Sequence, residues 1–237
     1  MAAPVAFVGG ATGFVGRATV AALCRRGVRT LAHVRPDSTK LATWRERFAA
    51  DGAEVDTTAW DAAALAARFR AVAPTHVFVL IGTTRARAKA DGVAGDIYET
   101  IDVGLTRLLA GAAAAVATAG GTAPRLIYLS SVGASETAGS AYLRARGRAE
   151  AAVRSAGVAW AIARPSIISG PGREDDRPAE RLAAGVTDGA LAVVGALGGR
   201  RVRDKYRSTT PDILAAALVR IGLDDPRDRI FEGAELR

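Results

Sequence analysis

The sequence predicts an α/β protein with a doubly wound, mostly parallel sheet and helices on both faces. Short apolar runs alternate with longer segments of helical periodicity, which is the pattern of β-α-β units. The first apolar run ends in a cluster of glycines, and polar residues follow three of the later runs. A chain of 237 residues suits one large domain, so we expect 1–237 to fold as a single domain.

The expected strands are short runs rich in β-branched and other apolar residues, bounded by Gly, Pro or polar side chains. In chain order they are VAFVG from Val5, TLAHV over Thr30–Val34, a weaker run around Val55, THVFVLIG from Thr75, PRLIYLSS from Pro124, VAWAIARP from Val158 and RIFEG near Ile230.

The expected helices lie between these runs. Gly120-Gly121 mark the end of the longest one, and Thr209 or Thr210 is a candidate cap for the last. Between Ser166 and 207 the pattern is irregular and richer in Gly, Pro and charge, which predicts a small C-terminal substrate-side segment attached to the doubly wound domain. The helices span Phe14–Arg26, Leu41–Ala50, Ala62–Val72, Tyr98–Ala119, Tyr142–Ala156 and Pro211–Ile221.

Several classes of protein are excluded by composition. Cys24 is the only cysteine, so no disulfide forms within the chain. His33 and His76 lie far apart and no His/Cys cluster has metal-ligand spacing, so we expect no metal. Neither a signal peptide nor an apolar run of about 18 residues is present, so we expect a cytoplasmic protein without a membrane segment.

The formal net charge of +8 raises nucleic acid as a partner, but the pattern argues against it. Only three of the 32 basic residues are lysines, and the arginines are scattered along the chain. Aromatic residues make up 5%, too few for a base-stacking platform. We interpret the charge as a compositional preference for arginine. The expected partner is a small-molecule substrate and not a nucleic acid.

The glycines after the first strand predict a dinucleotide-binding turn. Gly10, Gly13 and Gly16 lie between a strand and a helix, which is the context that a phosphate-binding loop requires. Gly10 would permit the tight turn, Gly13 the approach of the pyrophosphate, and Gly16 close packing of the helix. The helix N-terminus would then face the phosphates. The alternative is a glycine-rich turn that holds no ligand.

The end of the second strand favours NADP(H) over NAD(H). Arg35 comes 19 residues after Gly16, where NAD-binding proteins tend to place an acid for the ribose 2′-hydroxyl. An arginine there suits the 2′-phosphate, because its planar fork pairs with phosphate oxygens. Asp37 lies close by, and a turn shifted by two residues would reverse the preference.

Polar residues at later strand ends predict where the chemistry lies, since the reactive end of a cofactor lies beyond the carboxyl ends of the strands. Eleven residues after Ser131 comes Tyr142, and Arg146 follows one helical turn later. The serine would hydrogen-bond a substrate carbonyl, the tyrosine would act as general acid, and the cation would stabilise tyrosinate. Alternatively, Tyr142 and Arg146 form a surface pair and the serine caps a turn.

Five blocks of sequence resemble the short-chain dehydrogenase/reductases: GGATGFVG, IGTTRARAKADG, YLSSVGAS, YLRARGRAEAAV and ARPSIISGPGREDDRPAE. Their order is that of the superfamily, and they look most like its atypical branch, which includes the human Tat-interacting protein. The resemblance extends from Val5 to about Val219, and the GTTR and RPS…GPGRE blocks are more specific than the glycines.

This resemblance implies an NADP-binding Rossmann domain and a role for each matching residue. Ser131, Tyr142 and Arg146 match the catalytic Ser–Tyr–Lys triad, and 166–207 matches the substrate side. The implied cofactor contacts are the phosphate loop (Gly10, Thr12, Gly13, Phe14 and Val15), the 2′-phosphate contact Arg35, the adenine contact Asp56, the ribose segment Gly82, Thr83 and Thr84, and the nicotinamide wall Pro165 and Ile167.

One departure from the family bears on activity. The family pattern is Tyr-x-x-x-Lys, whereas this chain has arginine at position 146. Arginine keeps the charge but is bulkier than lysine and does not readily join a proton relay.

Three functions follow from this sequence, in order. The first is an NADP(H)-dependent oxidoreductase acting on a carbonyl or alcohol, and the second is a non-catalytic NADPH-binding regulatory or redox-sensing protein. A nucleotide-sugar epimerase or dehydratase comes third, because such relatives usually carry a larger C-terminal substrate domain and only about 70 residues follow Pro165 here. Both a monomer and a homodimer fit the sequence.

Overall fold

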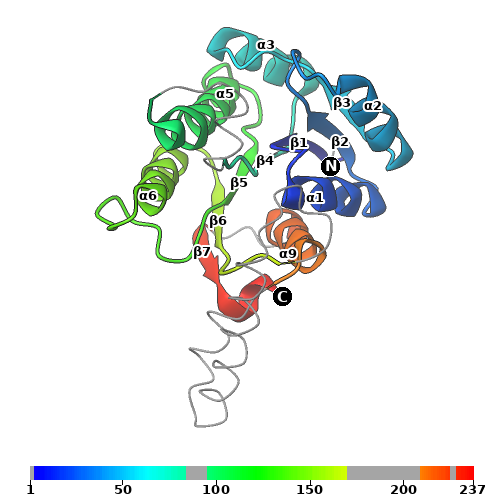
Figure 1. Cartoon of the computed structure of the whole chain (residues 1–237). Helices are drawn as coiled ribbons and strands as arrows, with labels where there is room; N and C mark the ends of the chain where they lie inside the picture. Colours follow the sequence, from blue (N-terminus) through cyan, green and yellow to red (C-terminus); the bar gives the residue numbers. More distant parts are fainter. Residues whose placement is uncertain (1–2, 84–94, 170–208, 225–227) are drawn as a thin grey trace.

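A computed structural model shows a seven-stranded sheet with the strand order β3-β2-β1-β4-β5-β6-β7 (Figure 1). The structure describes residues 3–83, 95–169, 209–224 and 228–237. Each pair of neighbouring strands is parallel. The chain winds outward from β1 to β3 and then from β4 to β7, so the doubly wound α/β fold predicted from the sequence is confirmed.

The strands are built from the apolar runs of the sequence. Their central residues are buried because helices cover both faces of the sheet, as is usual for parallel strands. The bounds are β1 Val5–Gly9, β2 Arg29–His33, β3 Glu54–Asp56, β4 His76–Val79, β5 Arg125–Leu129, β6 Trp160–Arg164 and β7 Arg229–Glu232.

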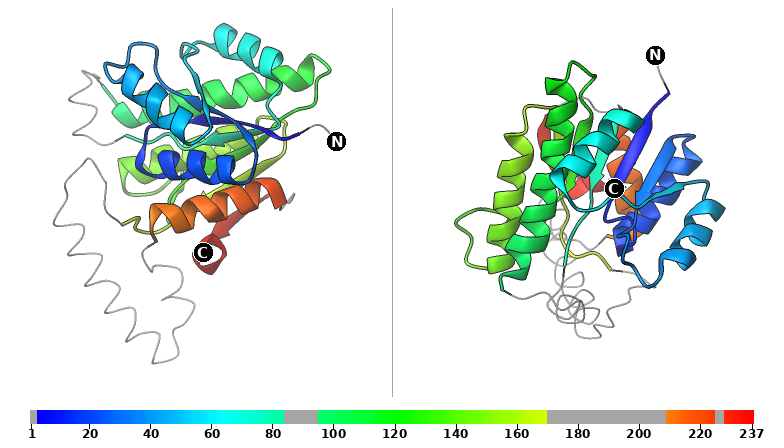
Figure 2. Two further views of the ribbon diagram at one scale, coloured as in Figure 1. Left: turned by 90° about the vertical axis from the view of Figure 1, so that its right-hand side faces the viewer. Right: turned by 90° about the horizontal axis from the view of Figure 1, so that it is seen from above.

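Helices α1, α2 and α9 cover one face of the sheet, and η1, α3, α5 and α6 cover the other (Figure 2). Leu23, Phe48 and Leu214 belong to the core cluster of the first face, and Phe69, Leu109 and Val153 belong to that of the second. The bounds are α1 Phe14–Arg25, α2 Leu41–Ala50, α3 Ala62–Val72, η1 Tyr98–Gly104, α5 Leu105–Thr118, α6 Ala141–Arg154, α9 Pro211–Asp224 and the 3₁₀ turn η2 Gly233–Leu236.

The main local difference from the sequence prediction concerns Tyr98–Ala119, which we expected to be one regular helix. Its first seven residues, η1, are a π-helix, and α5 continues from Leu105. By length and composition Tyr98–Thr118 would pass as a membrane span, but its buried residues Leu109, Ala113 and Val116 pack in the core of the second face. We therefore describe η1–α5 as a core helix of an α/β fold.

The register of the sheet brings the carboxyl ends of the central strands together. Gly9 pairs with Val79, Val79 with Tyr128, and Leu129 with Ala163, so β1, β4, β5 and β6 end at one edge. The glycine turn, Gly82, Ser131 and Pro165 follow directly from these four ends. Of the irregular segment expected over 166–207, only 166–169 lies within the described residues, where Ile168 forms a parallel bridge with Thr209.

Candidate functional site

The glycine turn between β1 and α1 has the geometry predicted from its spacing. Gly10 has φ +82°, a conformation that favours glycine, and a Cβ there would lie 2.6 Å from the carbonyl oxygen of Leu80. A Cβ on Gly16 would lie 2.1 Å from the carbonyl oxygen of Gly10. These two glycines therefore allow the backbone of the turn to pack against β4 and α1.

Gly13 differs from its neighbours because little surrounds it. Among the described residues, the Gly10 carbonyl oxygen at 3.1 Å is the only atom that a Cβ on Gly13 would meet within 4 Å. Gly13 is also the N-cap of α1, with no side-chain cap and no acidic residue in the first turn. An open backbone at the positive end of a helix fits a phosphate group.

The remaining residues expected around the phosphate loop lie at the start of α1. Val15 is buried, and Phe14 is the first residue of the helix. The carbonyl oxygen of Thr12 accepts a hydrogen bond of 3.1 Å from Nη1 of Arg17. Arg17, which the sequence analysis did not single out, therefore places a cation beside the turn.

Arg35 comes two residues after the end of β2, and Asp56 is the last residue of the neighbouring strand β3. Arg35 is exposed and lies 3.9 Å from Asp37, so the two residues that would read the ribose 2′ position are close together. Asp56 is buried: its Oδ1 accepts the Thr58 N–H at 3.0 Å, and its Oδ2 contacts Nε of Arg68 at 2.5 Å. Burial would raise the pKa of Asp56, but these hydrogen bonds outweigh it and the pKa is lowered. Its carboxylate is thus already engaged within the protein.

The residues that follow β4, β5 and β6 occupy one edge of the sheet. The N–H of Val132 donates to the carbonyl oxygen of Pro165 at 2.9 Å, which joins the turn of Ser131 to the end of β6. Ile167 continues from there, and its carbonyl accepts the Thr209 N–H at 2.9 Å. Thr84 lies outside the described residues.

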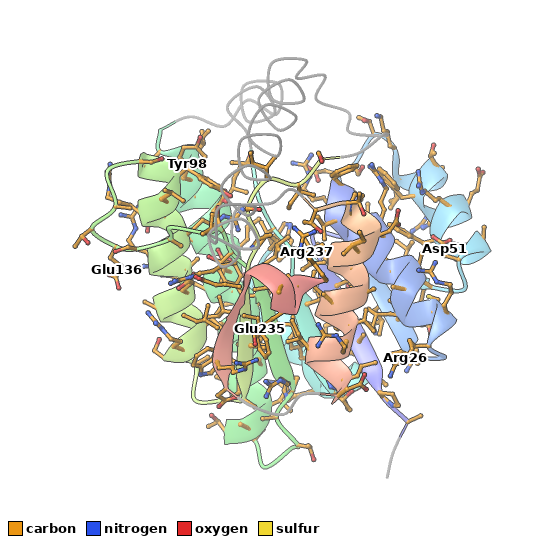
Figure 3. All side chains as sticks on the ribbon, turned by 90° about the horizontal axis from the view of Figure 1, so that it is seen from below. Arg26, Asp51, Tyr98, Glu136, Glu235 and Arg237 are labelled. Atoms are coloured by element: carbon orange, nitrogen blue, oxygen red, sulfur yellow. The ribbon has the colours of Figure 1, made fainter. Side chains whose placement is uncertain are left out.

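The loop after Ser131 folds back on α6, the helix that carries Tyr142. A Cβ on Gly147 would lie 2.3 Å from the carbonyl carbon of Ser135, so a glycine in α6 allows this close contact. The ring of Tyr142 packs against the ring of Tyr98 with centroids 5.7 Å apart. Figure 3 shows Tyr98 near the end of the molecule opposite Arg26, the residue that follows α1.

Arg146 is buried, and its guanidinium points to the strand ends. Its Nη1 lies 3.0 Å from the carbonyl oxygen of Ile81, 2.9 Å from that of Leu129 and 3.1 Å from the hydroxyl of Tyr128. A Cβ on Gly82 would lie 2.5 Å from its Nη2, so the glycine makes room for the guanidinium. Its Cζ is 5.2 Å from the ring centroid of Tyr142. The structure therefore brings Tyr142, Arg146 and Gly82 together.

Asp102, in the π-helix η1, is the acidic partner of this arginine. Its Oδ1 lies 3.0 Å from Nη2 of Arg146, and its Oδ2 accepts the Thr83 N–H at 3.3 Å. The residue is fully buried, and burial raises the pKa of Asp102 to about 6, although the nearby Arg146 opposes the rise. Burial likewise raises the pKa of Tyr128 to about 12, again opposed by Arg146.

A second buried network lies one turn further along α6. Glu150 accepts hydrogen bonds from the Ser130 hydroxyl at 2.6 Å and from Nε and Nη2 of Arg164 at 2.8 and 2.6 Å. Arg164 also reaches Glu232 in β7 at 3.3 Å. This network ties the ends of β5, β6 and β7 to the helix that carries Tyr142.

Asp102 and Tyr128 are site residues that the sequence analysis missed, and Glu150 is a buried residue of the neighbouring network that it also missed. Glu150 repeats the spacing of four from Tyr142 and Arg146, a signal that was present in the sequence. Asp102 lies far from Arg146 in the chain, and no local pattern pairs them.

Two other features lie outside this arrangement. Within the described residues, no group of three or more His, Cys, Asp or Glu side chains is placed to hold a metal ion. A groove of about 570 Å³ between α5 and α6 is lined mainly by small residues, including Ala110, Ala114 and Ala152, and it contains none of the residues discussed above. We therefore place the candidate site at the strand ends and not in this groove.

Solved structures with the same fold include both oxidoreductases and epimerases. A protein described as an epimerase from Burkholderia cenocepacia J2315 is 20% identical with a TM-score of 0.66, covering 96% of this chain and 74% of that one. A short-chain dehydrogenase/reductase family oxidoreductase from Burkholderia thailandensis is 18% identical with a TM-score of 0.64, covering 98% and 91%. The UDP-Glc/GlcNAc 4-epimerase from Campylobacter jejuni is 14% identical with a TM-score of 0.66, covering 98% and 78%.

Comparison with curated protein sequences finds no match. The predicted resemblance to the short-chain dehydrogenase/reductases is confirmed at the level of the superfamily, whereas the Tat-interacting branch stays a prediction. A family model described as NAD-dependent epimerase/dehydratase matches residues 6–204, and the chain therefore belongs to the NAD-dependent epimerase/dehydratase family.

Proposed function

We propose that this chain is an NADP(H)-dependent oxidoreductase acting on a carbonyl or alcohol substrate. The observation that carries the proposal is the close grouping of Tyr142 with a buried, permanently charged Arg146 at the edge where β4 and β5 end. In a doubly wound sheet, this edge is where the reactive end of a bound dinucleotide lies.

The cofactor part of the proposal rests on the glycine turn and Arg35. Gly13 leaves the N-terminus of α1 open to a pyrophosphate, and Gly10 and Gly16 are required by the turn itself. Arg35 lies exposed beyond the end of β2, and it would pair with a 2′-phosphate as its guanidinium does with other phosphates. Thr12, Phe14, Val15 and the 82–84 segment would complete the contacts.

The chemistry divides between the cofactor and the protein. A bound nicotinamide supplies or accepts a hydride. Ser131 would orient the substrate oxygen, and Tyr142 would give it a proton or take one from it. Arg146 would act as a fixed positive charge beside Tyr142, whereas a lysine at this position would also offer hydrogen bonds to a ribose.

Two alternatives have specific support. The two terminal nitrogens of Arg146 engage Ile81, Leu129, Tyr128 and Asp102, which favours a protein that binds the cofactor without turnover. The family description favours an epimerase or dehydratase. Coverage does not separate these two functions, because the chain covers 91% of the Burkholderia thailandensis oxidoreductase and 92% of a Bacillus halodurans protein described as an NAD-dependent epimerase/dehydratase.

The first test is a fluorescence titration of the protein with NADPH and, separately, with NADH. We expect NADPH to bind more tightly, and Arg35→Ala to weaken NADPH without weakening NADH. Arg154→Ala removes the same charge from the exposed end of α6 and is the matched control. Preferred binding of NADH would assign the ribose to Asp37 instead, and binding of neither cofactor would contradict both the oxidoreductase and the sensor.

The second test is oxidation of NADPH in the presence of a panel of aldehydes and ketones, with Tyr142→Phe as the inactive reference. Turnover that Tyr142→Phe abolishes would support the oxidoreductase. Tight NADPH binding with no turnover on any carbonyl of the panel would favour the sensor.

A further inference from the structure

Helix α6 presents three polar residues to the sheet at intervals of four: Tyr142, Arg146 and Glu150. Tyr142 lies in the first turn, Arg146 reaches the ends of β4 and β5, and Glu150 reaches the ends of β5 and β6. One face of the helix thus contains the proposed acid and two buried charges. Of these two charges, Arg146 is the one that contacts the ring of Tyr142, so the position of the acid depends on what holds Arg146.

Arg146 is held by elements other than its own helix: its hydrogen bonds and its ion pair are made with residues outside α6. Two of these partners are backbone carbonyls, one is the hydroxyl of Tyr128, and Asp102 provides the opposite charge. A buried guanidinium without a counter-charge is strongly unfavourable, so Asp102 determines whether Arg146 remains inside.

Asp102 also connects Arg146 to the segment that follows β4. One carboxylate oxygen pairs with the guanidinium at 3.0 Å, and the other accepts the backbone N–H of Thr83 at 3.3 Å. The carboxylate is presented from the π-helix η1, a widened turn of the kind often found at functional sites. Asp102 is thus the link between α6 and the 82–83 segment.

We propose that Asp102 is a positioning residue for Tyr142, acting through Arg146. It keeps the guanidinium against the ring of Tyr142 and in the space above Gly82, so that the proposed acid stands beside a fixed charge. When Asp102 is replaced, the guanidinium turns toward solvent and the ring of Tyr142 loses its neighbour. This inference rests on the proposed function only where it concerns catalysis.

Arginine and aspartate form one unit in this arrangement. Nη1 of Arg146 contacts two carbonyls and a hydroxyl while Nη2 contacts the carboxylate, whereas a lysine has one nitrogen for both sets of partners. We therefore expect Arg146→Lys to change the environment of Tyr142 as well, because a lysine at this position does not reproduce the contacts of the Arg146–Asp102 pair.

The direct test uses ¹⁹F NMR on protein labelled with 3-fluorotyrosine. The chain has four tyrosines, and the resonance of Tyr142 is assigned as the one missing from Tyr142→Phe. Asp102→Asn is expected to move that resonance by more than its line width. Glu150→Gln, which replaces another buried carboxylate in the neighbouring network, is the matched control and is expected to leave it in place.

A second pair of variants tests whether Asp102 acts through Arg146. The same pair still tests the proposal if Asp102→Asn alone folds poorly. Arg146→Met and Arg146→Met/Asp102→Asn should give the same Tyr142 resonance, because Asp102 has no further effect once the guanidinium is gone. A different resonance in the double variant would overturn the proposal. So would an unchanged resonance in Asp102→Asn, or an equal shift in Glu150→Gln.

Turnover provides a separate measurement at saturating NADPH. Asp102→Asn is expected to lower kcat on the order of tenfold to a hundredfold, as misplaced catalytic groups do, while Glu150→Gln lowers the melting temperature without a comparable loss of kcat. Equal losses of kcat in both variants would mean that a general loosening of the fold causes the effect, which would overturn the proposed role of Asp102. If the wild-type protein reduces no carbonyl, the proposed function fails, and the ¹⁹F measurement still decides the role of Asp102.

Discussion

Replacing Gly13 with alanine separates cofactor binding from folding. Gly13 has φ −71° and ψ 169°, which alanine adopts readily, and the added Cβ would meet only the Gly10 carbonyl oxygen, at 3.1 Å, among the described residues. The reduced freedom of the unfolded chain stabilises such a variant by about 0.4–1 kcal/mol. The close contact offsets part of this gain, so the free energy of unfolding should change by less than about 1 kcal/mol.

The effect on binding should be much larger. The methyl group would project from the backbone that a pyrophosphate approaches, and we expect the Kd for NADPH to rise about tenfold to a hundredfold, or about 1.4–2.7 kcal/mol. Binding is measured by fluorescence titration, and stability by urea unfolding of the same preparations.

Gly16→Ala is the matched control three residues away. Its Cβ would lie 2.1 Å from the Gly10 carbonyl oxygen and 2.8 Å from that of Ala11, so the turn or α1 must move. Overpacking of this kind costs about 1–3 kcal/mol, of which alanine's helix propensity returns up to about 1. If Gly13→Ala bound NADPH as tightly as the wild-type protein, the glycine turn would not be the phosphate site.

Three further predictions concern the buried charges. Arg146→Met should lower the free energy of unfolding by about 3–5 kcal/mol at pH 8 because it leaves Asp102 unpaired, and Arg146→Met/Asp102→Asn should recover part of this loss; urea unfolding of both variants decides. The pKa of Asp102 is raised to about 6 in the folded protein, so between pH 4 and 6 the folded state holds a proton that the unfolded state has released. The free energy of unfolding should therefore fall by about 3 kcal/mol as the pH rises through this range. Asp102→Asn should lack this pH-dependent component. Glu150→Gln should cost about 3 kcal/mol by leaving Arg164 with a weaker partner, and Glu54→Gln, which loses an exposed pair with Arg29, should cost less than about 1 kcal/mol in the same assay.

The layout of the fold could be predicted because its signals are local. Each buried strand is an apolar run, and glycines or polar residues follow it at the sheet edge, so their order alone indicated a doubly wound sheet. The length of one strand was predicted wrongly: THVFVLIG predicted a strand from Thr75 to Gly82, whereas β4 ends at Val79. The last three residues of that run lie at the site, where Ile81 contacts Arg146 and Gly82 makes room for it.

The π-helix η1 could not be predicted in the same way. A period of 3.6 residues describes a regular helix, and one widened turn changes too few positions to alter the pattern. The polar face of α6 could be predicted in part, since Tyr142 and Arg146 are one turn apart. Their partners Asp102 and Tyr128 come from other elements, so only the tertiary structure shows that Arg146 is buried.

Several arginines of this chain form buried ion pairs, which the net charge of +8 alone does not indicate. Arg68, Arg146 and Arg164 are each bound to a buried carboxylate, so these arginines link strands and helices inside the fold. At position 146 this link has a consequence for chemistry. Nη1 of Arg146 contacts two strand ends and Nη2 contacts a carboxylate, so the charge beside Tyr142 is held in place and both terminal nitrogens are already engaged. Under the proposed function, catalysis would therefore depend on the position of that charge, and Asp102, which holds it there, would be as important to the reaction as the arginine itself.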